Sequence, residues 1–447
     1  MSRFSQLCLL LCCLCLGSAL ATAQEEGGLI VELGDDPSAI DLPSVFDTSD
    51  TLPQVPSGFA SGSLAGNNVA GFRAERFEAP ATSMRNDFTS FPDFDGGLTI
   101  SGGGAAMKVG GYVKADLISD FDAINSTDTF NTGAIAIGEP DRRNARFHAR
   151  QSRLSFDSRW RVEQDVARAF VEIDFFGQRS GSSDTLRLRH AYGAFGNLTV
   201  GQTWTTFTDP SAVPQTLDTE GAVSNVNRRQ GLLRWQSPLW SDRVSLALAV
   251  EDPRITIEVP EQVDGELRTE TPDFVTRLRL EEDWCEFQIA MVLRELGFQP
   301  TGQAVLNELA WGFNFTGSVL FQPESKVYYQ ITFGEGIGSY RGSPDVVATG
   351  PTTAEILPVF GWMIGLKHSW SDRLTSNVTF SELNLDDVPG QSPDNLRNTS
   401  YFAINLIQNP YERVFWGVEY LYGVRTNQSL LSADARRLQM SFGFFLP

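Results

Sequence analysis

Apolar and polar residues alternate in short segments that recur from Ala106 to the end of this 447-residue chain. In residues 243–250 every second side chain is apolar: Val244, Leu246, Leu248 and Val250. Residues 326–334 and 413–422 repeat the pattern. Successive side chains of a β-strand point to opposite sides, so a period of two predicts strands with one apolar and one polar face. About sixteen such segments follow one another along the chain.

The connections between these segments are alternately short and long. Short turns are predicted where residues that favour turns interrupt the pattern: 196–197, 282–283, 371–372 and 409–410. Long polar connections fall between them: 119–144, 206–227, 252–271, 336–355, 383–396 and 425–435. A compact soluble domain, such as a β-sandwich with an aromatic core, rarely has so many long loops. The pattern favours an all-β fold, a transmembrane antiparallel β-barrel of about 16 strands over residues 99–447.

The first 98 residues differ in composition from the rest. Residues 1–23 contain Arg3, an apolar run at 7–16 and a small-residue exit at Ala23, which is typical of a cleaved secretory signal peptide. Residues 24–98 are rich in Pro, Gly, Ser and Asp and predict a flexible, acidic periplasmic leader. A chain with a formal net charge of −20 is not expected to bind nucleic acid. The expected partner is outer-membrane lipid, in a Gram-negative-type bacterium.

Arginines recur on the polar faces of several predicted strands. Placing an arginine toward lipid near mid-bilayer costs roughly 2–4 kcal/mol, so these side chains are predicted to face the lumen. The candidate pore-lining residues are Arg153, Arg187, Arg189, Arg228, Arg234, Arg277 and Arg279. Guanidinium groups bind carboxylates and phosphates, so a basic wall predicts a pathway for small anionic solutes. A second interpretation is a structural ladder in which Glu172 and Asp174 neutralise the arginines.

Strands are expected in pairs joined by a short turn, and each pair is followed by a loop on the opposite side of the barrel. Counted in this way, the connection 206–227 is the third loop. In sixteen-stranded porins the third loop commonly folds into the pore and narrows it. Asp209, Asp218 and Glu220 would then face the basic wall. An exposed outer loop is the alternative.

Three segments resemble the DcaP-like porins of Gram-negative outer membranes: 109–116 (VGGYVKAD), 151–156 (QSRLSF) and 199–204 (TVGQTW). The resemblance implies a homotrimer of sixteen-stranded barrels that favours small anionic solutes such as dicarboxylates. The chain departs from the family pattern in two respects. Its leader lacks the coiled-coil heptads found ahead of some family barrels, and it ends on Pro447 rather than on an aromatic residue, leaving Phe442 and Phe444 as the expected assembly aromatics.

An enzyme needs an activated nucleophile or a metal site, and neither pattern is visible. His190 and His368 fall on apolar stripes and are expected at the lipid interface, while His148 lies among arginines. We therefore expect no catalytic activity, no metal and no cofactor. A non-conducting structural or adhesive outer-membrane barrel is the remaining alternative to a porin.

Overall fold

The structure, a computed structural model, describes most of the chain beyond the leader. The described residues are 98–102, 105–140, 142–163, 165–178, 184–258, 265–322, 325–350, 353–388 and 391–446. They belong to one compact unit. The predicted signal peptide and the predicted leader up to residue 97 lie outside the described residues.

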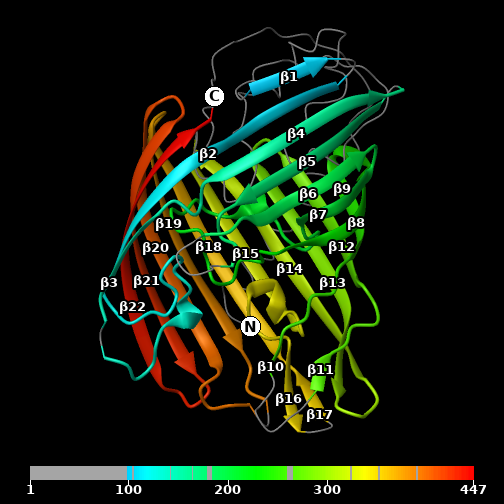
Figure 1. Ribbon diagram of the computed structural model, residues 1–447, viewed down its shortest axis with the longest axis vertical. Helices are drawn as coiled ribbons and strands as arrows, with labels where there is room; N and C mark the ends of the chain where they lie inside the picture. Colours follow the sequence, from blue (N-terminus) through cyan, green and yellow to red (C-terminus); the bar gives the residue numbers. More distant parts are fainter. Residues whose placement is uncertain are drawn as a thin grey trace. The chain divides into compact units, whose positions relative to one another are not determined.

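Sixteen antiparallel strand positions form a closed barrel in the described part of the chain (Figure 1). They are filled by β2 (Ala105–Asp120), β3 with β4 (Asn144–His148 and Arg153–Val162), β5 (Asp165–Asp174), β6 (Arg187–Phe195), β7 (Leu198–Trp204), β8 (Arg229–Leu239), β9 (Ser241–Glu251), β12 (Asp273–Glu282), β13 (Cys285–Pro300), β14 (Leu306–Gln322), β15 (Ser325–Glu335), β18 (Pro358–Ser371), β19 (Leu374–Leu385), β20 (Leu396–Tyr411), β21 (Val414–Asn427) and β22 (Ser432–Phe445). β22 pairs with β2, which closes the barrel. The predicted fold class is confirmed.

Short turns and longer loops alternate between the described strands. At one end the connections are short, and those described in full comprise residues 196–197, 240, 283–284, 372–373 and 412–413. At the other end the connections are named L1 to L8 and fall in the intervals 121–143, 175–186, 205–228, 252–272, 301–305, 336–357, 386–395 and 428–431. Within these intervals, residues 141, 179–183, 259–264, 351–352 and 389–390 lie outside the described part of the chain. The turn predicted at 409–410 is wrong, because β20 continues through an irregularity between Gln408 and Tyr411. A proline is tolerated in a strand at such a bulge.

Smaller elements accompany the barrel. β1 (Leu98–Gly102) pairs with the start of β2, and β11 (Gly265–Leu267) extends the sheet beside β13. β10 (Ile257–Glu258), β16 (Val346–Gly350) and β17 (Thr353–Ile356) form a separate sheet within L4 and L6. The short 3-10 helices are η5 (Thr132–Ala134), η6 (Pro210–Ala212) and η7 (Gly338–Arg341). None of the helices in the described residues is long and apolar enough to cross a membrane.

The two faces of each strand have opposite environments. On β4, Leu154 and Phe156 are exposed on the outside, whereas Arg153, Ser155 and Asp157 are buried inside the barrel. The outward apolar surface is suited to lipid and the inward polar surface to a wet lumen. The period-two prediction therefore holds at the level of individual side chains.

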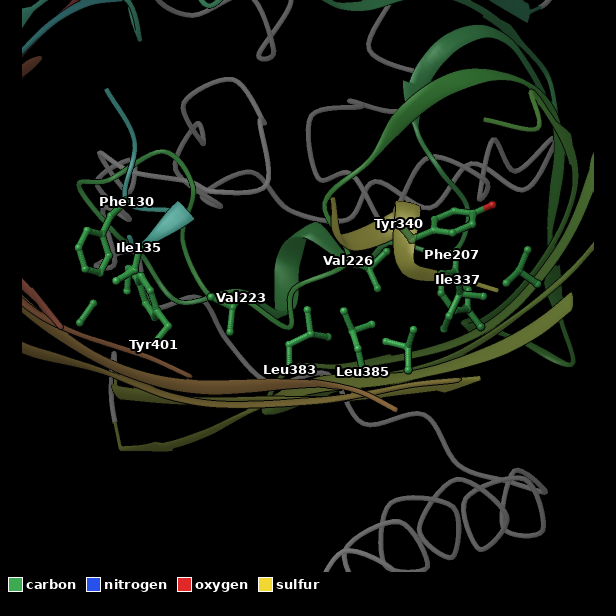
Figure 2. Close-up of a cluster of buried hydrophobic side chains, with 14 of the residues drawn as sticks. Phe130, Ile135, Phe207, Val223, Val226, Ile337, Tyr340, Leu383, Leu385 and Tyr401 are labelled. Atoms are coloured by element: carbon green, nitrogen blue, oxygen red, sulfur yellow. The ribbon is translucent and has the colours of Figure 1, made fainter. Parts of the chain in front are cut away.

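An apolar cluster lies inside the barrel, where three loops meet the wall (Figure 2). Its loop members are Phe130 and Ile135 of L1, Phe207, Val223 and Val226 of L3, and Ile337 and Tyr340 of L6. They pack against Leu383 and Leu385 of β19 and Tyr401 of β20. Burial of these side chains away from water stabilises the inward position of the loops.

Candidate functional site

L3 lies along the inner wall of the barrel. Five of its carbonyl oxygens accept hydrogen bonds from amide side chains of the wall, at 2.8–3.3 Å: Phe207 from Asn314, Thr208 from Gln288, Gln215 from Asn405, Leu217 from Gln439 and Ser224 from Gln330. The donors come from β13, β14, β15, β20 and β22. Buried backbone carbonyl groups require such partners, so the wall amides fix the path of the loop. L3 therefore covers the β13–β22 side of the lumen.

The middle of L3 is held by a group that we name the L3 clamp, consisting of Glu419, Asn405 and Lys114. The Glu419 carboxylate of β21 accepts hydrogen bonds from the backbone N–H groups of Leu217 and Asp218, at 2.9 and 2.8 Å. It also accepts one from Asn405, at 2.8 Å. Lys114 Nζ of β2 donates to the Leu217 carbonyl at 2.6 Å. Hydrogen bonds to ionised groups are stronger than those between neutral groups, so the clamp is a firm anchor.

Asp209, near the start of L3, contacts the predicted basic wall. Its carboxylate lies 2.8 Å from Arg279 Nη1 of β12 and accepts a hydrogen bond from Thr316 at 2.6 Å. Arg279 also pairs with Glu286 at 2.7 Å and Glu281 at 3.1 Å. Three carboxylates therefore surround this arginine, which makes it an anchor for L3 rather than an open anion site.

Asp218 faces a different part of the barrel from the one expected. It accepts hydrogen bonds from the backbone N–H groups of Phe130 in L1 and Glu220, both at 2.9 Å, and lies 3.5 Å from Arg437 of β22. The expectation that it faces the basic wall is wrong, because the L3 clamp turns this stretch toward β22. Burial raises the pKa of Asp218 above its ordinary value, although Arg437 opposes the shift.

Glu220 lies within the electrostatic reach of the basic wall. Burial and the neighbouring Asp218 raise its pKa, while the charges of Arg341 and Arg187 lower it; the net shift is upward. Arg341 belongs to L6, and burial lowers its pKa to about 9. Glu220 is thus the one of the three predicted loop acids that interacts with Arg187.

Five arginines and three carboxylates from β4, β5 and β6 form what we name the β4–β6 cluster: Arg153, Arg159, Arg168, Arg187, Arg189, Asp157, Glu172 and Asp174. Each carboxylate serves two arginines. Asp157 binds Arg159 and Arg168, at 3.0 and 2.9 Å. Asp174 binds Arg187 and Arg189, at 2.6 and 2.8 Å. Glu172 lies 2.8 Å from Arg189 and 3.8 Å from Arg153. The cluster therefore carries an excess of positive charge.

The other predicted arginines lie elsewhere. Arg234 is buried on the inward face of β8, and Arg277 on β12 donates to the side-chain oxygen of Gln236 at 2.6 Å. Arg228 precedes β8, and its guanidinium lies 5.4 Å from the ring centre of Tyr340 in L6. It belongs to the loop region and not to the strand wall.

Sequence reasoning missed Arg159 and Arg168. Arg159 lies two residues after the inward Asp157, and Arg168 lies four residues before the inward Glu172. The alternation of inward and outward side chains therefore predicts that both arginines face the lumen. The sequence-based prediction that His190 lies at the lipid interface is wrong. A register shift between β5 and β6 at this position turns His190 inward, where it hydrogen-bonds Thr203 at 2.9 Å. His368 does lie beside Trp370, with ring centres 4.4 Å apart.

Comparison with known proteins agrees with this geometry. The model of the DcaP outer membrane protein family matches residues 93–444. The crystal structure of the outer membrane channel DcaP of Acinetobacter baumannii superposes with a TM-score of 0.71 at 19% identity, covering 78% of this chain and 100% of that one. OmpF of Salmonella typhi in complex with daunomycin gives 0.51 at 9% identity, covering 78% and 100%. No curated protein matches the chain.

A closed barrel with an apolar outside, a charged lumen and an inward loop has the architecture of an outer-membrane channel of the porin class. With the family match over nearly all described residues, the chain belongs to the DcaP outer membrane protein family. Its location is the outer membrane of a Gram-negative bacterium. Among the described residues, no group of three or more His, Cys, Asp or Glu side chains is placed to hold a metal ion.

Proposed function

We propose that this protein is a diffusion channel for small hydrophilic solutes with a preference for anions such as dicarboxylates. The observation that carries the proposal is the imbalance in the β4–β6 cluster, where five arginines share three carboxylates. Guanidinium groups remain charged at any physiological pH and offer five donors each. A lumen wall with surplus guanidinium lowers the barrier for an entering carboxylate.

The cluster runs from the loop end of the barrel toward the turn end. Arg187 begins β6 directly after L2, and 42% of its side-chain surface is exposed. Arg159 and Arg168 lie near the β4–β5 turn at the opposite end. A solute carboxylate can replace the shared Asp174 at Arg187 and then move to the pair at Asp157. A solute with two carboxylates can bind two neighbouring groups of arginines at once, which favours dicarboxylates.

Mutual neutralisation is the competing interpretation of the same residues. Each arginine of the cluster lies within 3.8 Å of a carboxylate, so the ion pairs also stabilise the wall. An adhesive barrel that conducts nothing would keep them for that reason alone. The excess of arginine over carboxylate favours a channel, because surplus positive charge on a lumen wall raises the local concentration of anions.

Reversal potentials in a salt gradient across planar bilayers test the proposal. Mature wild-type protein is expected to give stepwise conductance with anion preference, and Arg187→Glu to weaken that preference. Asp174→Asn, which removes a neutralising charge yet keeps an acceptor for Phe176, is expected to strengthen it. Arg268→Glu in the exposed part of L4 is the control for surface charge. Absence of conductance, or equal selectivity in all four proteins, would refute the proposal.

We also propose a homotrimer, which the family resemblance implies. Mass measurement of the detergent-solubilised protein tests it independently of conductance. A monomeric mass would remove this part of the proposal and leave the channel function intact.

A further inference from the structure

An apolar pocket lies between L4, L6 and the ends of β13 and β14 that L5 connects. The smaller elements that enclose it, β10, β11, β16 and β17, lie in the lower part of Figure 1. We name it the L4–L6 pocket; its apolar lining includes Ile257, Leu267, Leu296, Phe298, Val346 and Ile356. The long loops of bacterial barrels face the cell exterior, so the pocket is accessible from outside the cell.

The size of the pocket suits a small ligand. Its volume is about 210 Å³. A cavity of about 150 Å³ lined by Leu, Ile and Phe side chains is large enough to bind benzene. The L4–L6 pocket therefore has room for one six-membered ring and a short side chain. Leu296 and Phe298 are almost fully buried, whereas Leu267 is 40% exposed, so the pocket joins a buried floor to an exposed side.

The two loops that form the pocket are tied together by Asp345 of L6. Its carboxylate accepts a hydrogen bond from the backbone N–H group of Thr256 in L4 at 2.9 Å and lies 3.2 Å from Arg294 Nη1 of β13. Directly after Asp345, β16 pairs with β17 and with β10, where Val346 is in register with Ile257. These contacts fix the walls before a ligand binds, which reduces the entropic cost of binding.

Glu308 gives the pocket a negative charge. It is in register with Leu296, and directly opposed residues of an antiparallel pair lie on the same face, so its side chain lies on the pocket side of β14. Glu355 of β17 also lines the pocket. Within the described ranges neither glutamate forms an ion pair, and no arginine, lysine or histidine lines the pocket.

The surrounding elements add negative charge and do not cancel it. Their arginines already have carboxylate partners within 3.7 Å: Arg254 with Asp252, Arg268 with Glu266, and Arg294 with Asp273 and Asp345. Arg341 of L6 is directed to L3, where it donates to the carbonyl oxygen of Ala222 at 3.2 Å. Glu270 of L4 and Glu295 of β13 are further carboxylates. A cleft with apolar walls and charge of one sign concentrates ions of the opposite sign.

We propose that the L4–L6 pocket binds small organic cations in which a protonated amine is joined to one aromatic ring by a short alkyl chain. The ring lies against Leu296, Phe298 and Ile356, and the ammonium group lies beside the Glu308 carboxylate. Burial of the ring supplies affinity, and the glutamate selects the sign of the charge. The site and the charge of its ligand differ from those of the proposed solute pathway, so the two proposals can fail separately.

A ligand-observed NMR titration of the full mature protein in non-ionic detergent with 2-phenylethylamine tests this site. The matched neutral ligand is 2-phenylethanol, which differs only in its polar group. Wild type is expected to bind the amine several times more tightly than the alcohol. Equal affinity for the two ligands, or tighter binding of the alcohol, would overturn the proposal.

Three variants assign the binding to the pocket. Glu308→Gln keeps the size of the side chain and is expected to weaken binding of the amine about two- to fivefold, the range for an exposed ion pair, without affecting the alcohol. The matched variant Glu412→Gln, in the turn at the other end of the barrel, is expected to bind both ligands like wild type. Ala354→Phe fills the pocket with a ring and is expected to reduce binding of both ligands to the level of detergent alone.

Two results from these variants would contradict the site. Equal binding of the amine by wild type and Glu308→Gln would show that the carboxylate does not recognise the ligand. Undiminished binding by Ala354→Phe, with the barrel intact by circular dichroism, would place the ligand outside the pocket. Either result overturns the proposal.

Discussion

The L3 clamp allows a sharp test of what holds the loop inside the barrel. Glu419→Gln changes little in size but replaces one carboxylate oxygen by an N–H₂ group. That group then faces the backbone N–H donors of Leu217 and Asp218, which lie 2.9 and 2.8 Å from the native oxygens. At least one donor is left without an acceptor, and the others lose a charged partner.

The size of the effect follows from the hydrogen bonds involved. Glu419 accepts three, from Leu217, Asp218 and Asn405. A hydrogen bond to a charged group contributes about 1.5–3 kcal/mol, and an unmatched buried donor costs about 1–3 kcal/mol. The remaining amide oxygen recovers part of this, so a net loss of about 2–4 kcal/mol is expected. The opening equilibrium of the middle of L3 then rises by roughly thirty- to several-hundred-fold.

Hydrogen exchange followed by mass spectrometry measures this opening directly, and single-channel noise reports it in bilayers. Peptides that contain Leu217 and Asp218 are expected to exchange faster in Glu419→Gln. The control is Glu251→Gln, since Glu251 accepts from Thr206 N at 2.7 Å at the base of L3. This variant is expected to accelerate exchange near Thr206 and not near Leu217. Unchanged exchange at Leu217 and Asp218 would refute the assignment of Glu419 as their anchor.

Three other predictions concern the same loop. Because the pKa values of Asp218 and Glu220 are raised, acidification is expected to remove their negative charge and to increase anion preference. The reversal potential should change with pH, and the midpoint of this change should lie above the ordinary carboxyl pKa of about 4. A midpoint at or below about pH 4 would contradict the prediction. Gly365→Ala places a Cβ on β18 only 2.1 Å from Cγ of Pro214 in L3, so L3 must move. The unit conductance is therefore expected to change. An unaltered conductance would count against contact between β18 and L3. Leu383→Ala is expected to cost about 2–5 kcal/mol in unfolding free energy, and a loss below about 1 kcal/mol would show that the apolar cluster inside the barrel is not tightly packed.

Sequence alone was sufficient for the architecture. Alternation of apolar and polar residues is a local property of each strand, and an arginine on the lipid face is too costly to be tolerated, so parity assigned Arg153, Arg187 and Arg277 to the inside. The same parity, followed further along the chain, would have found Arg159 and Arg168. Alternating loop lengths indicated which strand ends lie together.

The tertiary structure decided the rest, because the remaining features depend on contacts between distant residues. The partner of Leu217 is Glu419, two hundred positions away, and nothing local to either residue indicates the pair. Asp218 turns toward Arg437 for the same reason. A single extra residue in β6 reverses the side to which His190 points, and only the observed register reveals it. Alternation therefore determined which side chains are inside the barrel, and three-dimensional packing determined which of them meet.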